Sequence, residues 1–128
     1  MPARSWFSYA VVRVVPLVER EEFVNAGIVL YCEELDFLEA RIDLDAARLS
    51  AMAPAADLSV VRKHLEAIPR VCTGGPGAGP IGELPIGERW RWIIAPRSTV
   101  VQTSAAHPGL CSEPRGALDR LMAQLVRR

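Results

Sequence analysis

Three stretches in the first third of the chain are rich in apolar, β-branched and aromatic residues, which suit the pleated surface of a sheet. The first runs from Trp6 to Pro16, the second from about Phe23 to Cys32, and the third from about Phe37 to Leu44. The segments between them are short and charged, so consecutive strands can pair as hairpins. The pattern therefore predicts an N-terminal three-stranded antiparallel meander.

Alternation within these strands predicts which side chains face the core. Most of their apolar residues fall on even numbers, as Val12 and Ile28 do. Because successive side chains of a strand point to opposite faces, we predict that even positions face the core and odd positions the other face. Arg13, Asn25 and Gly27 then share the odd-numbered face, with Arg13 opposite one of the other two.

Helical patterns follow the meander. Asp45 and Asp57 are placed as N-caps of a short and a longer helix, because their carboxylates can accept hydrogen bonds from first-turn N–H groups. The longer helix has an apolar stripe at three- and four-residue steps, formed by Leu58, Val61, Leu65, Ile68 and Cys72. Residues 73–82 hold five glycines and two prolines, and we expect a flexible loop there.

Beyond this loop the pattern predicts a helix over Ile86–Ile94, a strand over Thr99–Thr103 and a last helix from about Glu113 to Val126. We therefore expect a single α+β domain over residues 1–128. Its antiparallel sheet would combine the meander with the later strand, and the helices would pack on one face of that sheet.

Charge and cysteine content narrow the classes of function. The 15 basic and 15 acidic residues cancel, which argues against nucleic-acid binding by the whole molecule. Cys32, Cys72 and Cys111 lack CxxC spacing, so neither disulfides nor a zinc site is predicted. The sequence predicts neither a signal peptide nor a membrane-spanning segment. We expect a cytoplasmic protein without a metal or other cofactor.

One candidate site lies at the predicted junction between the third helix and the late strand. Arg97, Ser98 and Thr99 place a guanidinium and two hydroxyls there, and Gln102 adds an amide. Such donors could hold a phosphate or a carboxylate. The alternative is structural: Arg97 would pair with an acidic neighbour, and the hydroxyls would satisfy the turn.

A second candidate site is the odd-numbered sheet face. Arg13 interrupts an apolar strand there, and Gly27 would permit close approach by another backbone or by a ligand beside Asn25. The alternative is a solvated face on which Arg13 forms weak surface pairs with Glu39 or Asp43.

A third candidate is the segment from His107 to Cys111, which brings an imidazole and a thiol within four residues. An imidazole that lowers a thiol pKa creates a nucleophile. The alternative is an inert, buried Cys111, and the Pro-Gly between the two residues leaves their relative orientation open.

Four segments together resemble a known family: Tyr9-Ala-Val-Val-Arg13, Phe23-Val-Asn-Ala-Gly-Ile-Val-Leu30, Ala95-Pro-Arg-Ser-Thr99 and His107-x-Gly-Leu-Cys111. They span nearly the whole chain, which resembles the bacterial family called domain of unknown function 3037. The resemblance implies no activity. It does imply a protein partner, a HipA-like kinase-fold protein often encoded beside members. The family-like positions are Arg13, Asn25, Gly27, Arg97, Ser98, Thr99, Gln102 and His107.

Two hypotheses follow. The first is a non-catalytic binding or accessory module that contacts a protein partner or an anionic ligand through these residues, because no catalytic carboxylate pair or metal set is evident. The second is a small enzyme acting on a phosphorylated or nucleotide substrate, in which Arg13 and Arg97 clamp the anion and His107 is the acid or base. The second hypothesis predicts one cavity that unites these three residues.

Overall fold

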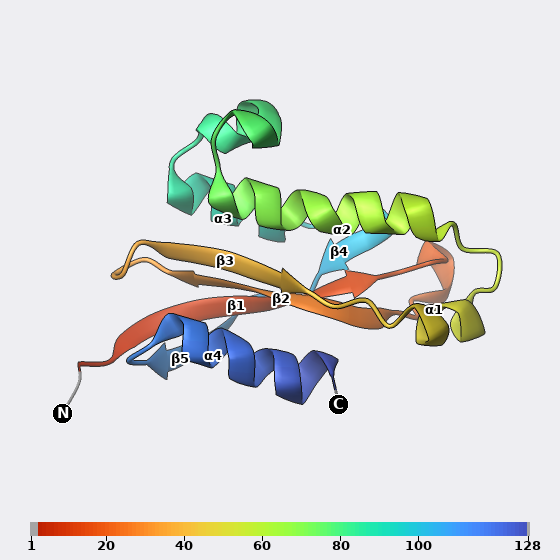
Figure 1. The fold of residues 1–128 in the computed structure, drawn as a ribbon, viewed down its shortest axis with the longest axis horizontal. Helices are drawn as coiled ribbons and strands as arrows, with labels where there is room; N and C mark the ends of the chain where they lie inside the picture. The colour runs from red at the N-terminus through yellow and green to blue at the C-terminus, as the bar shows by residue number, and fades with distance from the viewer. Residues whose placement is uncertain (1–2, 128) are drawn as a thin grey trace.

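The three predicted N-terminal strands are present and pair in sequence order as an antiparallel meander (Figure 1). The computed structural model describes residues 3–127. Its strands are β1 (Ser5–Val14), β2 (Val24–Cys32), β3 (Phe37–Ile42), β4 (Val101–Thr103) and β5 (His107–Cys111). Its helices are η1 (Val18–Arg20), α1 (Ala46–Met52), α2 (Leu58–Thr73), η2 (Pro76–Glu83), α3 (Ile86–Ile94), α4 (Pro114–Leu121) and η3 (Met122–Val126). The α+β class is confirmed, and Asp45 and Asp57 are the N-caps of α1 and α2.

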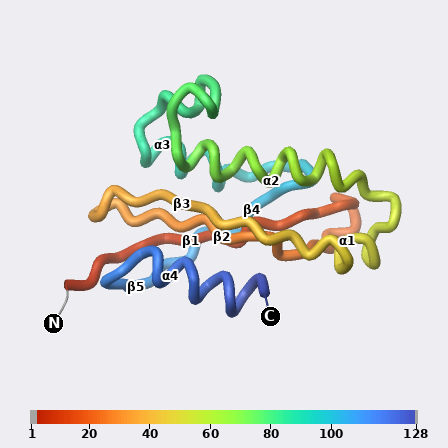
Figure 2. The backbone as a smooth tube through the Cα atoms, in the orientation of Figure 1, coloured from red at the N-terminus to blue at the C-terminus, as the bar shows by residue number. Residues whose placement is uncertain are grey.

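The sheet is open and ordered β3-β2-β1-β4, and β5 also pairs with β1. The late strand predicted over Thr99–Thr103 is β4, which runs antiparallel to the end of β1. The unpredicted β5 runs antiparallel to the first half of β1, along the same edge. Because β1 is ten residues long, it accommodates both short strands in line. Figure 2 shows the chain continuing from β5 into the last helices.

The prediction that helices pack on one face of the sheet is wrong, since they cover both faces (Figure 1). One core cluster joins sheet residues to α2 and α3, and a second joins the opposite face to α4 and η3. A strand buried on both faces is apolar at successive positions, so its sequence does not alternate. β2 is such a strand, for Ala26 and Ile28–Leu30 are all completely buried.

A β-bulge in β2 explains why the predicted assignment of even residues to one core face is only partly correct. Val12 pairs with Gly27 but Arg13 pairs with Asn25, so β2 has one extra residue, Ala26. On the far side of the bulge odd residues of β1 face even residues of β2. Ile28 therefore lies in the cluster under α4, whereas Val12 lies in the cluster under α2.

The segment predicted as a loop over residues 73–82 is largely helical. α2 continues to Thr73, and η2 follows with one non-helical residue, Gly79. Arg89 of α3 holds this connection, because its guanidinium donates hydrogen bonds to the main-chain oxygens of Val71, Cys72 and Leu84. Within residues 3–127, no helix is long and apolar enough to span a membrane.

Candidate functional site

A row of polar side chains crosses three strands on the sheet face that α4 covers. Arg13 of β1 pairs directly with Asn25 of β2 on one side and with Gln102 of β4 on the other. Directly opposed residues of antiparallel strands project to the same face, so the three side chains are neighbours. The bulge produces this arrangement, since without the extra residue Asn25 would project to the α2 face.

An open cleft of about 470 Å³ lies at the β4 side of this row. It is lined by Arg13, Val15, Val18, Glu21, Phe23, Arg97, Ser98 and Gln102. These residues come from the end of β1, the β1–β2 connection, the α3–β4 junction and β4. The cleft therefore unites two predicted sites, the sheet-face arginine and the Arg97 junction.

Arg13 is held by an aromatic ring and has no acidic partner among residues 3–127. Its guanidinium carbon lies 4.1 Å from the centre of the Phe23 ring, a cation–π contact. Its Nε is buried without a hydrogen-bond partner, as is Oδ1 of the opposed Asn25. Nδ2 of Asn25 donates to the main-chain oxygen of Leu125, at 3.0 Å, which ties this strand to the end of the last helix.

Arg97 is likewise stacked on an aromatic ring, and no carboxylate of the described residues lies within ion-pair distance of it. Its guanidinium carbon lies 4.2 Å from the ring centre of Trp92 in α3, and Nη2 donates to the main-chain oxygen of the same residue. Burial lowers the pKa of Arg97 from its ordinary value, yet an arginine stays protonated in proteins. A partly desolvated positive charge at this position is stabilised by an anion.

The other polar residues of the junction divide between the cleft and the turn. Ser98 lines the cleft. Thr99 does not line it, and its hydroxyl donates to the main-chain oxygen of Val101 at 2.8 Å. The amide of Gln102 donates to the main-chain oxygen of Thr99 at 2.8 Å, which fixes one edge of the cleft.

Gly27 lies outside the cleft and has a packing role. It pairs with Val12, whose side chain lies in the core under α2, on the opposite side from Arg13. A Cβ at Gly27 would lie 2.4 Å from the main-chain oxygen of Arg41 and 2.7 Å from Cδ1 of Ile42. The close approach that glycine permits here is therefore that of β3, not of a ligand.

His107 is separated from the cleft along the sheet. It pairs with Tyr9, four residues from Arg13 on β1, and its exposed ring lies 5.4 Å from the Tyr9 ring. Cys111 is buried at the far end of the same strand, about 13 Å away at the usual strand rise, and burial raises its thiol pKa. The imidazole is therefore out of reach of both the thiol and the two arginines.

Sequence reasoning missed the contribution of the β1–β2 connection, which supplies Val18, Glu21 and Phe23. One signal was available for Phe23: it lies two positions before Asn25 and so shares the face of Arg13. Among residues 3–127, no group of three His, Cys, Asp or Glu side chains is arranged to hold a metal ion. The cleft thus offers two cations, an amide and a hydroxyl, with the Glu21 carboxylate at one side.

Comparison with known proteins places the chain in one family. The family model described as "Protein of unknown function (DUF3037)" matches residues 9–126. No curated protein and no solved structure matches the chain.

Proposed function

Since the chain belongs to the DUF3037 family of proteins of unknown function, we propose from its geometry that it is a non-catalytic binding module that recognises an anionic group in the Arg13–Arg97 cleft. The group would be a carboxylate or a phosphate, carried by a protein partner or by a small molecule. Both groups, the planar carboxylate and the tetrahedral phosphate, present oxygen atoms that guanidinium groups bind through charge-assisted hydrogen bonds.

One contrast among the arginines carries the proposal. Six arginines of the described chain form ion pairs with carboxylates: Arg20, Arg41, Arg48, Arg70, Arg115 and Arg127. The other described arginines form no ion pair within residues 3–127, and among them only Arg13 and Arg97 are partly buried in one shared cleft. Arg4, Arg62, Arg91 and Arg120 are exposed, and Arg89 donates to three main-chain oxygens. Removing two like charges from water without a counter-charge is unfavourable, and a bound anion offsets that cost.

The aromatic rings support the same function by limiting the motion of the cations. Phe23 lies against Arg13, and Trp92 lies against Arg97. A guanidinium already held in place loses less side-chain entropy when a ligand binds. Glu21, on the same cleft, would repel a bound anion, so the two guanidinium groups must outweigh its charge.

The structure does not favour the alternative of a small enzyme. That hypothesis needs His107 in one cavity with both arginines, and His107 lies beside Tyr9, away from the residues that line the cleft. We therefore advance no second function.

The module would act in the cytoplasm, where its three buried thiols stay reduced.

Thermal unfolding with added anions tests the proposal. Sodium phosphate and sodium citrate are titrated at constant ionic strength against the wild-type protein and the Arg13→Gln, Arg97→Gln and Arg62→Gln variants. Arg62, on α2, is the matched control because it is exposed and remote from the cleft. An anion that binds only the folded state adds about 2.7 kcal/mol at a hundredfold excess over its Kd.

We expect a saturable rise in Tm for the wild type and for Arg62→Gln, and its loss in both cleft variants. General salt effects on the surface would stabilise all four proteins equally. An equal response of the four proteins would therefore contradict the proposal.

The protein-partner form of the proposal has its own test. A partner, such as the HipA-like kinase-fold protein implied by the family resemblance, would insert an acidic side chain between the two arginines. Affinity capture from native cells with wild-type and Arg97→Glu bait should then recover that partner with the wild type alone. Recovery of the same proteins by both baits would exclude the cleft as the contact.

A further inference from the structure

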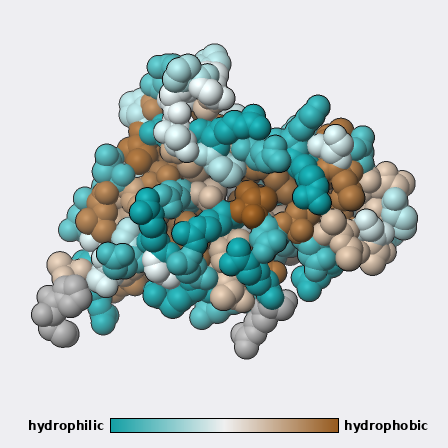
Figure 3. All heavy atoms as spheres, in the orientation of Figure 1, coloured by the Kyte–Doolittle hydropathy of each residue, from teal (hydrophilic) through white to brown (hydrophobic). Residues whose placement is uncertain are grey.

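The edge of the sheet farthest from the cleft is formed by β3, which pairs with β2 on one side only. β3 lies between α2 and α4 on the side nearest the viewer in Figure 1. Figure 3, in the same orientation, shows hydrophobic atoms exposed in a band between the two helical layers. The edge strand is thus bordered by the helices without a further strand over it.

The main-chain groups of β3 alternate in direction. The N–H of Asp43 donates to the main-chain oxygen of Ala26 in β2, at 2.8 Å, so odd-numbered residues of this segment direct their main-chain groups inward. The even-numbered residues Leu38, Ala40 and Ile42 direct theirs away from β2. These three residues form a regular set of donors and acceptors for another strand.

Proteins usually block an exposed edge with a proline, a bulge or charged side chains, especially lysine. β3 has no proline, bulge or lysine, since its sequence is FLEARI and its pairing with β2 is regular over all six residues, and its two charged residues, Glu39 and Arg41, are of opposite sign. β5, on the opposite edge, does carry such a block in Pro108. An edge left regular and unblocked is suited to pairing with another chain.

The charges of β3 are self-complementary about its centre. If two copies pair antiparallel with Ala40 opposite Ala40, then Glu39 of each copy lies opposite Arg41 of the other, and Leu38 lies opposite Ile42. Registers centred on Glu39 or on Arg41 would instead place like charges together, which is destabilising. The register centred on Ala40 also pairs the outward main-chain groups of all three even-numbered residues.

We propose that β3 is a homodimer interface, at which two copies of this chain join in antiparallel register about Ala40 to form one continuous sheet. The contact is isologous and closes with two copies. Because β3 and the β4 side of the sheet are opposite edges, the dimer would leave both Arg13–Arg97 cleft openings free.

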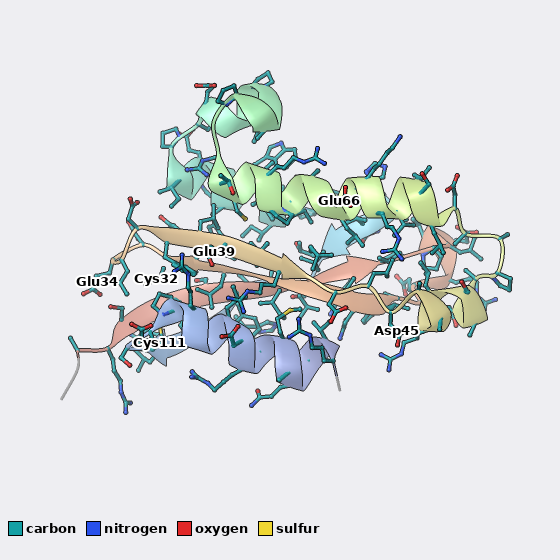
Figure 4. All side chains as sticks on the ribbon, in the orientation of Figure 1. Cys32, Glu34, Glu39, Asp45, Glu66 and Cys111 are labelled. Atoms are coloured by element: carbon teal, nitrogen blue, oxygen red, sulfur yellow. The ribbon has the colours of Figure 1, made fainter. Side chains whose placement is uncertain are left out.

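Neighbouring side chains strengthen the charge pattern on the α4 face. Within one chain Glu39 accepts a hydrogen bond from Arg115 at 2.9 Å, and Arg41 pairs with Asp119 (Glu39 is labelled in Figure 4). In the dimer each cross-strand Glu39–Arg41 pair would join these two pairs into a row of four charges of alternating sign. Networks of this kind hold register better than isolated surface pairs do.

Charge reversal with mixing tests the proposal. The Glu39→Arg chain presents two positive side chains to its copy, and the Arg41→Glu chain presents two negative ones. Each variant alone should fail to dimerise, whereas an equimolar mixture should form a heterodimer because every cross-strand pair is again of opposite sign. Arg20→Glu is the matched control, since it removes an exposed ion pair and reverses a charge far from β3.

Sedimentation velocity from roughly 1 µM to 500 µM, which covers the affinities of small interfaces, gives the readout, and circular dichroism checks that each variant is folded. We expect the weight-average mass of the wild type and of Arg20→Glu to approach twice the mass of one chain. Each β3 variant alone should stay at half that value, the mass of a monomer. The equimolar mixture of the two β3 variants should return to the mass of a dimer. A wild type that stays monomeric, a β3 variant that still dimerises, or a mixture that does not recover would each overturn the proposal. Ala40→Pro, which removes the central outward N–H, should also give monomers.

Discussion

Replacing Gly27 by alanine tests whether β3 can approach β2 this closely, beside the bulge, only because residue 27 has no side chain. The added Cβ would lie 2.4 Å from the main-chain oxygen of Arg41 and 2.7 Å from Cδ1 of Ile42, whereas ordinary contact begins near 3.4 Å. A side-chain rotation could relieve the second contact. The first is with backbone, so relief requires β3 to move by about 1 Å, the shortfall from ordinary contact.

The expected cost follows from that movement. Overpacking a buried site costs about 1–3 kcal/mol, and lengthening β2–β3 hydrogen bonds adds about 1 kcal/mol for each bond lost. Gly27 is fully inside the sheet, with Val12 and Ile42 as its paired neighbours. We therefore expect Gly27→Ala to lower the free energy of unfolding by about 3 kcal/mol, and Tm by roughly 10–15 °C at this chain length.

Urea denaturation followed by circular dichroism measures the effect. Gly77→Ala is the control, because no atom lies within 4 Å of its added Cβ and its φ is not in the left-handed region. That change should be neutral or should stabilise by up to about 1 kcal/mol, through the lower entropy of the unfolded chain. If Gly27→Ala unfolds within about 0.5 kcal/mol of the wild type, the packing argument fails.

Three further changes probe the helices that flank the sheet. Arg89→Met should lower the free energy of unfolding by about 3 kcal/mol, because three main-chain oxygens lose a charged donor. Its control is Arg91→Met, at an exposed position, which should stay within about 0.5 kcal/mol of the wild type in the same urea assay. Asp57→Ala should lower the free energy of unfolding by about 1 kcal/mol, since two first-turn N–H groups lose their acceptor. Asp57→Asn keeps a side-chain acceptor and should retain most of that stability. Equal stability of the two variants would argue against capping. Burial raises the pKa of Cys72 from 9.0 to about 12, so from about pH 9 upward the unfolded state loses a proton that the folded state keeps. The contribution of Cys72 to stability is therefore complete below pH 9 and declines toward pH 12 by up to about 1.4 kcal/mol per pH unit. Urea titrations from pH 8 to about 10.5 should show that the free energy of unfolding falls less steeply with pH for Cys72→Ala than for the wild type.

Local patterns were sufficient for the secondary structure near the start of the chain. The strands of the meander, the two aspartate caps and the stripe of α2 each depend on residues close in sequence, through strand alternation, capping and helical periodicity. The predicted last helix is also present, beginning after Glu113 and ending in η3 at Val126. β5 was missed because His-Pro-Gly-Leu-Cys has little strand propensity, and pairing with β1 imposes the strand.

The site was predictable in its parts but not in its assembly. Alternation alone suggested that Arg13 lies near Asn25 or Gly27, and the junction composition singled out Arg97 and Ser98. The choice of Asn25 over Gly27 depends on the bulge, which only the pairing of β1 with β2 reveals. The meeting of Arg13 with Arg97 depends on β4 pairing with the end of β1.

The amino-acid sequence by itself determined which segments become strands and helices, because those choices depend on periodicity and capping over a few residues. Tertiary structure alone decided that helices cover both sheet faces, that Gly27 serves packing instead of a ligand, and that two distant arginines share a cleft. The physical reason is that these outcomes are set by the register and burial of strands paired across long sequence separations, which no local pattern encodes.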